Sequence, residues 1–99
     1  MILVRDVFQL KFGQAKEAVA AWQEGVAIMK RLGGGQTPRL LTDLVGPYYT
    51  LVFEHSYPSL AEYERSSREG MANEEWRAWY PKVAALAGGG HREIFNIVG

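Results

Sequence analysis

The stretch YYTLVFEHSY, residues 48–57, places the tightest constraint on the fold. Apolar and aromatic side chains occupy both of its alternating positions, a pattern typical of a strand that is covered on two faces. A Gly-Pro pair precedes the stretch and a Pro-Ser pair follows it, so turn-forming residues set both of its ends. We therefore predict that it is the central strand, with Glu54 and His55 as its least expected residues.

The rest of the chain alternates between strand-like and helix-like patterns. The N-terminal segment alternates apolar and polar residues with the period of a strand, and the segment after Gly13 changes to the three- and four-residue spacing of an amphipathic helix. Pro38 suggests that the second strand lies at an edge, and the Gly-Pro turn joins that strand to the central one as a hairpin. The predicted strands are residues 1–12, 36–45, 48–57 and 91–98, and the predicted helices are residues 14–32, 59–68 and 73–87.

Short polar residues and proline mark the later helices. Ser59 and Glu62 have the spacing of a capping box, and Asn73 can cap the next helix. Gly70 is expected to break the helix between them. Pro81 must either kink the following helix or divide it in two, and the sequence does not decide which.

Glycines are expected to stop two helices and to allow one close contact. Gly33 and Gly88 each begin a run of three glycines after a helical pattern, which indicates helix stops. Neither run is followed by Lys and Ser or Thr, so neither is a phosphate-binding loop. Gly25, in the middle of the first helix, costs roughly 1 kcal/mol relative to alanine, and we expect a close approach to the sheet there.

The order of these elements predicts the fold class. Helix, three glycines and strand occur in both halves of the chain, which gives the order βαββαβ. Two such halves with right-handed crossovers make a ferredoxin-like α+β sandwich, whose four-stranded antiparallel sheet has its first and third strands in the centre and its helices on one face. We expect residues 1–99 to form one such domain.

The face of this sheet without helices is expected to be apolar. Val7, Tyr48, Thr50 and Val52 would point away from the helices, and each large apolar side chain left in water forgoes roughly 1.5 to 3 kcal/mol of burial. A large exposed apolar patch marks an interface. We therefore predict a symmetric homodimer in which two copies pack sheet against sheet.

Charge and composition exclude several other partners. Eleven basic and eleven acidic residues cancel and form no basic stripe, so we expect no nucleic acid partner. No stretch approaches about 18 consecutive apolar residues, and none has the zones of a signal peptide, so we expect no membrane contact and a cytoplasmic location. The absence of cysteine removes disulfides, thiolate metal sites and cysteine nucleophiles.

The order and pattern of these segments resemble those of a known protein superfamily. The βαββαβ order, the strand and helix TLVFEHSYPSLAEYE, the segment NEEWRAWY at residues 73–80 and the final strand REIF at residues 92–95 look like the dimeric α/β-barrel superfamily, and within it the NIPSNAP-like members. The resemblance covers nearly the whole chain and implies a homodimer. The superfamily includes cofactor-independent monooxygenases, haem-degrading enzymes and isomerases, so it does not fix the reaction. The haem-degrading branch has a His near its second-half helix, and the helix at residues 73–87 has none.

Two residues are candidates for acid–base chemistry. If Phe8 pairs with Phe53, the same register places Asp6 opposite His55, and both side chains would point at the helices. A carboxylate that orients an imidazole makes a general base near neutral pH. The alternative is a structural pair near the strand ends.

Aromatic residues are candidates for a ligand site. Trp76, Trp79 and Tyr80 have spacings that let a helix cover a cleft and stack on a planar molecule, and Tyr49 lies next to the hairpin. Packing in the core is the alternative for all four. His91 is expected to be a solvated residue at the start of the last strand, and Asn96 either faces the barrel interior or bonds across the dimer.

These residues leave two functions open. The first is a homodimeric binding protein that holds a small apolar or aromatic molecule between sheet and helices. The second is a cofactor-independent monooxygenase or isomerase acting on a phenolic or quinol-like substrate, with His55 as base and Asp6 orienting it. His55 and His91 lack a third ligand at metal spacing, so a zinc or iron site would require Asp6 or Glu54 as well. We expect neither a metal nor a cofactor.

Overall fold

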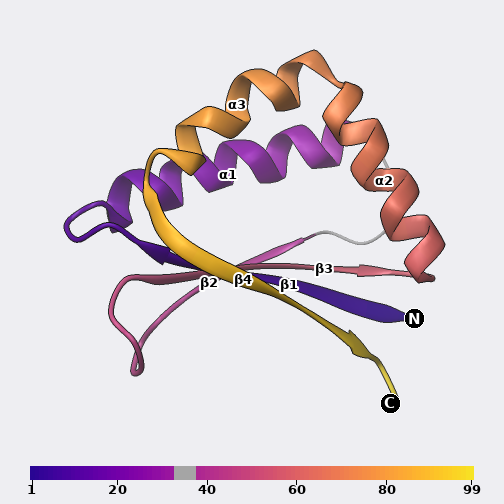
Figure 1. Cartoon of the computed structure of the whole chain (residues 1–99), viewed down its shortest axis with the longest axis horizontal. Coiled ribbons are helices and arrows are strands. Elements are labelled where there is room, and N and C mark those ends of the chain that lie inside the picture. Colours follow the sequence, from indigo (N-terminus) through magenta and orange to yellow (C-terminus); the bar gives the residue numbers. More distant parts are fainter. Residues whose placement is uncertain (33–37) are drawn as a thin grey trace.

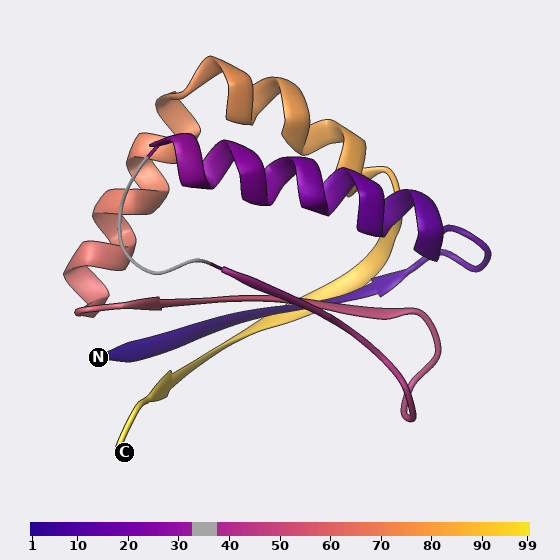
Figure 2. The same ribbon diagram turned by 180° about the vertical axis from the view of Figure 1, so that it is seen from behind.

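The computed structural model describes residues 1–32 and 38–99. Its elements are β1 (Ile2–Leu10), α1 (Ala15–Leu32), β2 (Arg39–Thr42), β3 (Thr50–Tyr57), α2 (Leu60–Ala72), α3 (Glu74–Ala84) and β4 (Ala87–Asn96). The strands form one antiparallel sheet in the order β2-β3-β1-β4, and the helices all lie on one face of it (Figures 1 and 2). The predicted ferredoxin-like α+β sandwich with β1 and β3 in the centre is confirmed. No helix in the described parts of the chain is long and apolar enough to cross a membrane.

The predicted caps form, whereas two predicted glycine breaks do not. The Ser59 hydroxyl accepts a hydrogen bond from the Glu62 amide at 3.2 Å, and the Asn73 side chain accepts one from the Trp76 amide at 2.9 Å. Gly70 lies inside α2, because the helix continues until Asn73 caps the next one. Gly88 to Gly90 belong to β4, where Gly89 and Gly90 pair with β1 and the missing side chain of Gly90 allows close approach to the Val7 carbonyl.

Some predicted boundaries are displaced or lie outside the described residues. Pro81 is inside α3, so it does not divide that helix. β4 begins at Ala87 rather than His91, and β2 and β3 form the expected hairpin but are shorter than predicted. The predicted helix stop at Gly33 and strand start at Gln36 lie outside the described residues.

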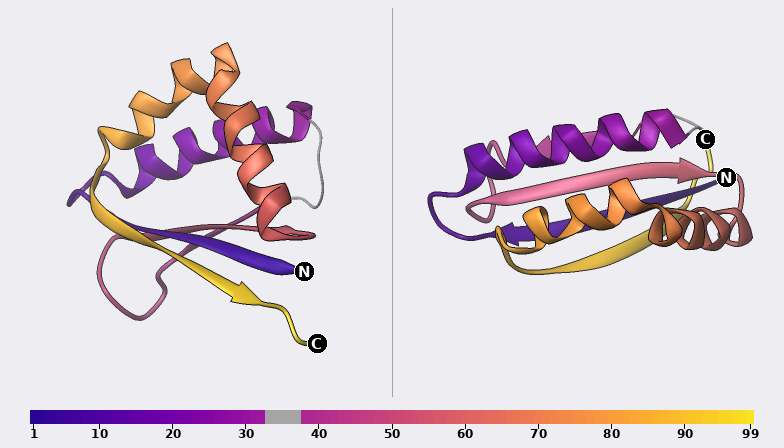
Figure 3. Two further views of the ribbon diagram at one scale, coloured as in Figure 1. Left: turned by 45° about the vertical axis from the view of Figure 1, so that its right-hand side comes forward. Right: turned by 90° about the horizontal axis from the view of Figure 1, so that it is seen from above.

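The core lies between α1, α3 and the sheet. Trp22 on α1 packs edge-on against Trp79 on α3, with ring centroids 4.9 Å apart, and also contacts Phe53 on β3. Trp79 is 2% exposed, and its indole N–H donates a 2.6 Å hydrogen bond to the Ala21 carbonyl oxygen. The close contact predicted at Gly25 is present, but its partner is Trp79 and not the sheet. Figure 3 (right) shows α1 and α3 running beside each other above the strands.

The pairing of β1 with β3 differs from the prediction by two residues. Asp6 lies opposite Phe53, Phe8 opposite Leu51 and Val4 opposite His55. The predicted Asp6–His55 pairing is therefore wrong. Because side chains alternate with a period of two, this shift leaves the paired residues of β1 and β3 on their predicted faces. Asp6 and His55 thus still lie on the helix-covered side.

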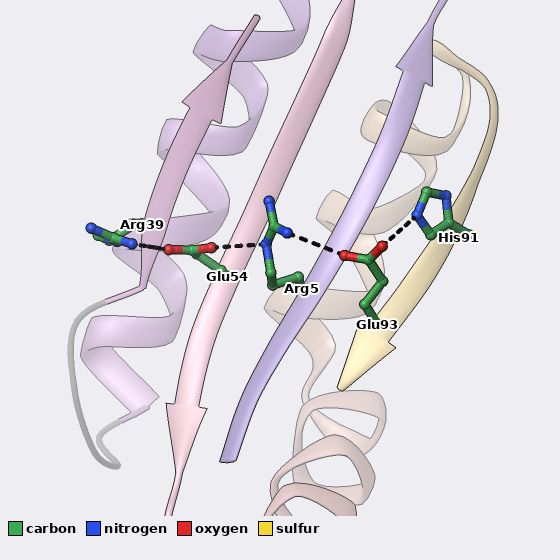
Figure 4. Close-up of polar contacts among 5 residues, drawn as sticks. All are labelled: Arg5, Arg39, Glu54, His91 and Glu93. Carbon is green, nitrogen blue, oxygen red and sulfur yellow. Dashed lines mark hydrogen bonds and ion pairs between the residues drawn. The ribbon is translucent and has the colours of Figure 1, made fainter. Parts of the chain in front are cut away.

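The helix-free face is less apolar than predicted, because a row of charged side chains crosses it. Arg39, Glu54, Arg5, Glu93 and His91 are linked in that order across β2, β3, β1 and β4 (Figure 4). We call these five residues the charge ladder. Glu54 is 4% exposed, because the Arg5 and Arg39 guanidinium groups bond both of its carboxylate oxygens.

Apolar residues flank the charge ladder on the same face. Val7 and Val52 pair directly across β1 and β3, and Val52 is buried even in the single chain. Leu41 on β2 and Phe95 on β4 are exposed. Tyr48 precedes β3 in a turn and is exposed, so it is not part of this strand face.

Candidate ligand-binding site

A cavity of about 530 Å³ lies between the helix-covered face of the sheet and the helices. Its volume falls within the range of small-molecule sites, roughly 300 to 1,000 Å³. Side chains from β1, β3, β4 and all three helices line it. They are Asp6, Met29, Leu32, Phe53, His55, Tyr57, Tyr63, Ser66, Ser67, Gly70, Met71, Trp76, Arg77, Tyr80, Pro81 and Arg92.

Four of the six predicted site residues line this cavity. Asp6 and His55 reach it from the sheet, and Trp76 and Tyr80 from α3. The other two lie elsewhere among the described residues. Trp79 packs in the core as described above, and Tyr49 lies in the turn just before β3, where its ring meets that of Phe12 edge-on with centroids 5.1 Å apart. The aromatic residues of α3 therefore have two locations: Trp76 and Tyr80 line the cavity, and Trp79 is buried in the core.

One wall of the cavity is polar. Arg92 on β4 lies opposite Asp6 on β1, and its Nε donates a 2.5 Å hydrogen bond to the Asp6 carboxylate. The Arg92 guanidinium also lies 5.7 Å from the centre of the Tyr63 ring on α2, a distance typical of a cation–π contact. The hydrogen bond to Asp6 raises the pKa of Arg92, so this side chain is a permanent cation.

Tyr57 on β3 extends this polar wall toward α2. Its ring packs against Tyr63 with centroids 5.2 Å apart. Burial raises the pKa of Tyr57 above its ordinary value and outweighs the interaction with the Ser66 side chain, which lowers it. The phenol is therefore protonated at neutral pH. We call Asp6, Tyr57, Tyr63, Ser66 and Arg92 the polar wall.

A second wall is apolar. Helix α1 contributes only Met29 and Leu32 to the cavity, and the neighbouring part of the sheet contributes Phe53. These three residues are the apolar wall. In the view from above, α1 lies on the side of the sheet away from β4, which carries Arg92 (Figure 3, right). The cavity thus changes from apolar to polar across the sheet.

His55 lies in the sheet floor between these walls. It is 5% exposed, and its ring packs on Tyr57 with centroids 4.4 Å apart. Its position on β3, two residues before Tyr57, places both rings on the same face. A buried imidazole at this position could take a proton from the hydroxyl group of a bound molecule and return it.

The sequence pattern missed the residues that complete the polar wall. Tyr57 could have been found, because it is two residues beyond His55 on the same strand. Tyr63 and Ser66 are three residues apart on one helix, a spacing that indicates a shared face but not its direction. Arg92 gave no local signal, because only the β1–β4 pairing brings it to Asp6.

The remaining candidate residues lie outside the cavity. His91 is exposed on the helix-free face, where its Nε2 lies 3.2 Å from a Glu93 carboxylate oxygen. Asn96 is exposed at the end of β4, opposite Ile2. Within residues 1–32 and 38–99, no three His, Asp or Glu side chains are grouped as metal ligands.

Solved structures share this fold over nearly the full chain. A NIPSNAP family protein from Agrobacterium tumefaciens superimposes with a TM-score of 0.89 at 18% identity, covering 98% of this chain and 85% of that one. An uncharacterised NIPSNAP domain protein from Burkholderia xenovorans gives a TM-score of 0.85 at 17% identity, covering 99% and 95%. A protein described as an antibiotic biosynthesis monooxygenase gives 0.77 at 18% identity, covering 100% of both chains.

Sequence comparison identifies the family. No match was found among functionally curated proteins. The profile of the NIPSNAP family, in contrast, matches residues 5–96, which include most of β1 and the whole of the other strands and helices of the described structure. The chain therefore belongs to the NIPSNAP family.

Proposed function

We propose that this protein is a homodimer that binds a small apolar or aromatic molecule in the cavity between its sheet and helices. The observation that carries this proposal is the cavity of about 530 Å³, which combines aromatic side chains with a few convergent polar groups. Such a composition is typical of small-molecule sites. The family resemblance adds the fold but not the ligand.

A neutral fluorescent probe tests binding in the cavity. We expect N-phenyl-1-naphthylamine to bind with increased emission, because its rings would leave water for apolar and aromatic surroundings. Ser67→Phe should weaken binding by about tenfold or more, since Ser67 lines the cavity and a phenyl group there would occupy it. The matched control is Ala61→Phe, which adds the same group at an exposed position of the same helix. Equal affinities for the two variants would contradict a site in this cavity.

The helix-free face supports the homodimer. The ladder's two Arg and two Glu side chains carry no net charge, so a second copy could cover it without burying an unbalanced charge. Alternating charges on the face also let two copies related by a twofold axis place unlike charges together. Leu41 and Phe95 would supply apolar contacts beside it.

Sedimentation equilibrium tests the dimer directly. We expect a species of twice the 11.1 kDa chain mass at micromolar concentration. Phe95→Glu should weaken association by about tenfold or more, because a carboxylate would be buried without a partner. Leu60→Glu, at an exposed position on α2, is the matched control and should leave the dimer intact. A compact species of single-chain mass for the unmodified protein would exclude the dimer.

A second candidate function is a cofactor-independent monooxygenase or isomerase acting on a phenolic or quinol-like substrate. It is favoured by the buried His55 in the cavity floor and by the fold shared with the monooxygenase named above. In the oxygenase, His55 would take the proton of a substrate hydroxyl, and the resulting electron-rich anion would reduce dioxygen. Asp6 lies in the same cavity, but its carboxylate is bonded to Arg92 and lies opposite Phe53.

Oxygen uptake with a panel of quinols tests this activity. We expect His55→Ala to lower the uptake rate by roughly a hundredfold or more, the usual contribution of a general base. His91→Ala removes the protein's other histidine at an exposed position and should have no effect. Uptake that is unchanged in His55→Ala would remove the proposed base.

A further inference from the structure

We infer that the cavity's ligand is an aromatic carboxylate, whose ring rests on the apolar wall and whose anionic group is held at Arg92. This inference rests on the proposed binding function and adds the chemical class of the ligand. It is carried by the division of the cavity into an apolar and a polar wall and by the donors that Arg92 presents.

Arg92 has binding capacity left after its bond to Asp6. That bond uses Nε, and none of the described residues accepts a hydrogen bond from the two Nη groups. The Arg92 side chain is 56% exposed, so these groups are accessible at the mouth of the cavity. A guanidinium edge of this kind matches the two oxygens of a carboxylate.

The charges lining the cavity favour an anion. Arg77 and Arg92 contribute two positive charges, and Asp6 contributes one negative charge. Apart from His55, the lining therefore carries one formal positive charge. The protonated Tyr57 phenol and the Tyr63 hydroxyl on the same wall are further hydrogen-bond donors. A carboxylate can accept hydrogen bonds from these groups, whereas a neutral apolar molecule cannot.

The other lining residues favour an aromatic body over a flexible chain. Trp76 and Tyr80 on α3 and Phe53 in the floor contribute aromatic rings to the lining, and aromatic rings pack against one another in stacked or edge-on arrangements. The cavity lies between two packed layers. A flat aromatic molecule bound between the sheet and α3 would direct its carboxylate to Arg92 on β4.

Titration calorimetry with a matched pair of probes tests the inference. The matched probes are 2-naphthoate and its neutral isostere 2-naphthamide. Decanoate is the third probe and carries its carboxylate on a flexible chain. We expect 2-naphthoate to bind about tenfold or more tightly than either of the others. Equal affinity for naphthoate and naphthamide would exclude anion recognition, and equal affinity for naphthoate and decanoate would exclude an aromatic body. If no probe binds, including the neutral one, the proposed binding function itself fails.

Variants locate the anion site. Arg92→Gln should remove the preference for naphthoate over naphthamide, and Arg92→Lys should retain part of that preference. Asp6→Asn should tighten naphthoate binding several-fold, because it removes the carboxylate that competes for Arg92. Arg65→Gln, an exposed change of the same charge on α2 outside the cavity, should have no effect. A preference that persists in Arg92→Gln, or weaker binding to Asp6→Asn, would overturn the assignment to Arg92.

Discussion

Replacing Gly25 with alanine is expected to lower the free energy of unfolding by about 2 kcal/mol, although alanine is the better helix former. A β-carbon at this position would lie 2.3 Å from Cζ2 of Trp79. The indole cannot move aside freely, because it is fully buried and its N–H is bonded to the Ala21 carbonyl one turn earlier on α1. The helix pair would have to separate, with loss of core packing. Thermal or urea unfolding measures the change.

Gly70 provides the matched control for this prediction. It is also inside a helix, but a β-carbon there would come no closer than 3.9 Å to the Trp76 ring. Gly70→Ala should therefore stabilise the protein by up to about 1 kcal/mol through helix propensity alone. The double variant Gly25→Ala/Trp79→Phe replaces the indole by a smaller ring. It should lose less free energy of unfolding than the sum of the two single changes. A Gly25→Ala protein as stable as the unmodified one would contradict the proposed steric conflict.

Removing the buried carboxylate of the charge ladder is expected to cost about 2 kcal/mol. Glu54→Ala would leave the Arg5 and Arg39 guanidinium groups facing each other without the anion that bonds both. The cost is limited, because Arg39 is largely exposed and can turn toward water. Urea unfolding at constant protein concentration measures it, since association would add to the apparent stability.

An exposed glutamate gives the comparison. Glu69 pairs with Arg65 on the surface of α2, so Glu69→Ala should change the stability by less than about 0.5 kcal/mol. The loss of stability in Glu54→Gln should lie between those of Glu54→Ala and Glu69→Ala, because the amide oxygen remains as a hydrogen-bond acceptor. If Glu54→Ala and Glu69→Ala have equal effects, burial of the ladder contributes nothing to stability.

The local elements of this fold could be predicted from the sequence because their causes are local. The hydrophobic period changes from two to between three and four after Gly13, and this change marks the end of β1 and the approach to α1. The Ser59 and Asn73 caps form where short polar side chains precede helical patterns. The Gly-Pro turn links β2 to β3 as a hairpin.

Glycine was the least reliable of the local signals. Gly13 lies between β1 and α1, as predicted, whereas Gly70 lies inside α2 and Gly90 pairs within β4. A β-carbon at Gly90 would lie 2.5 Å from the Val7 carbonyl oxygen, so this glycine permits close strand pairing rather than a helix stop. The distinction depends on a neighbour that is distant in sequence.

The sequence alone determined the elements, their order and the face on which each strand residue lies, because these follow from periodicity and turn chemistry along the chain. Tertiary structure decided which residues meet across the sheet. A two-residue shift between β1 and β3 preserves every face and yet moves Asp6 away from His55, and only the pairing with β4 brings Arg92 to Asp6. The charge ladder and the bond between Asp6 and Arg92 depend on such pairings, and the contact between Gly25 and Trp79 depends on how α1 packs against α3. The pattern within a single strand or helix carries no information about either.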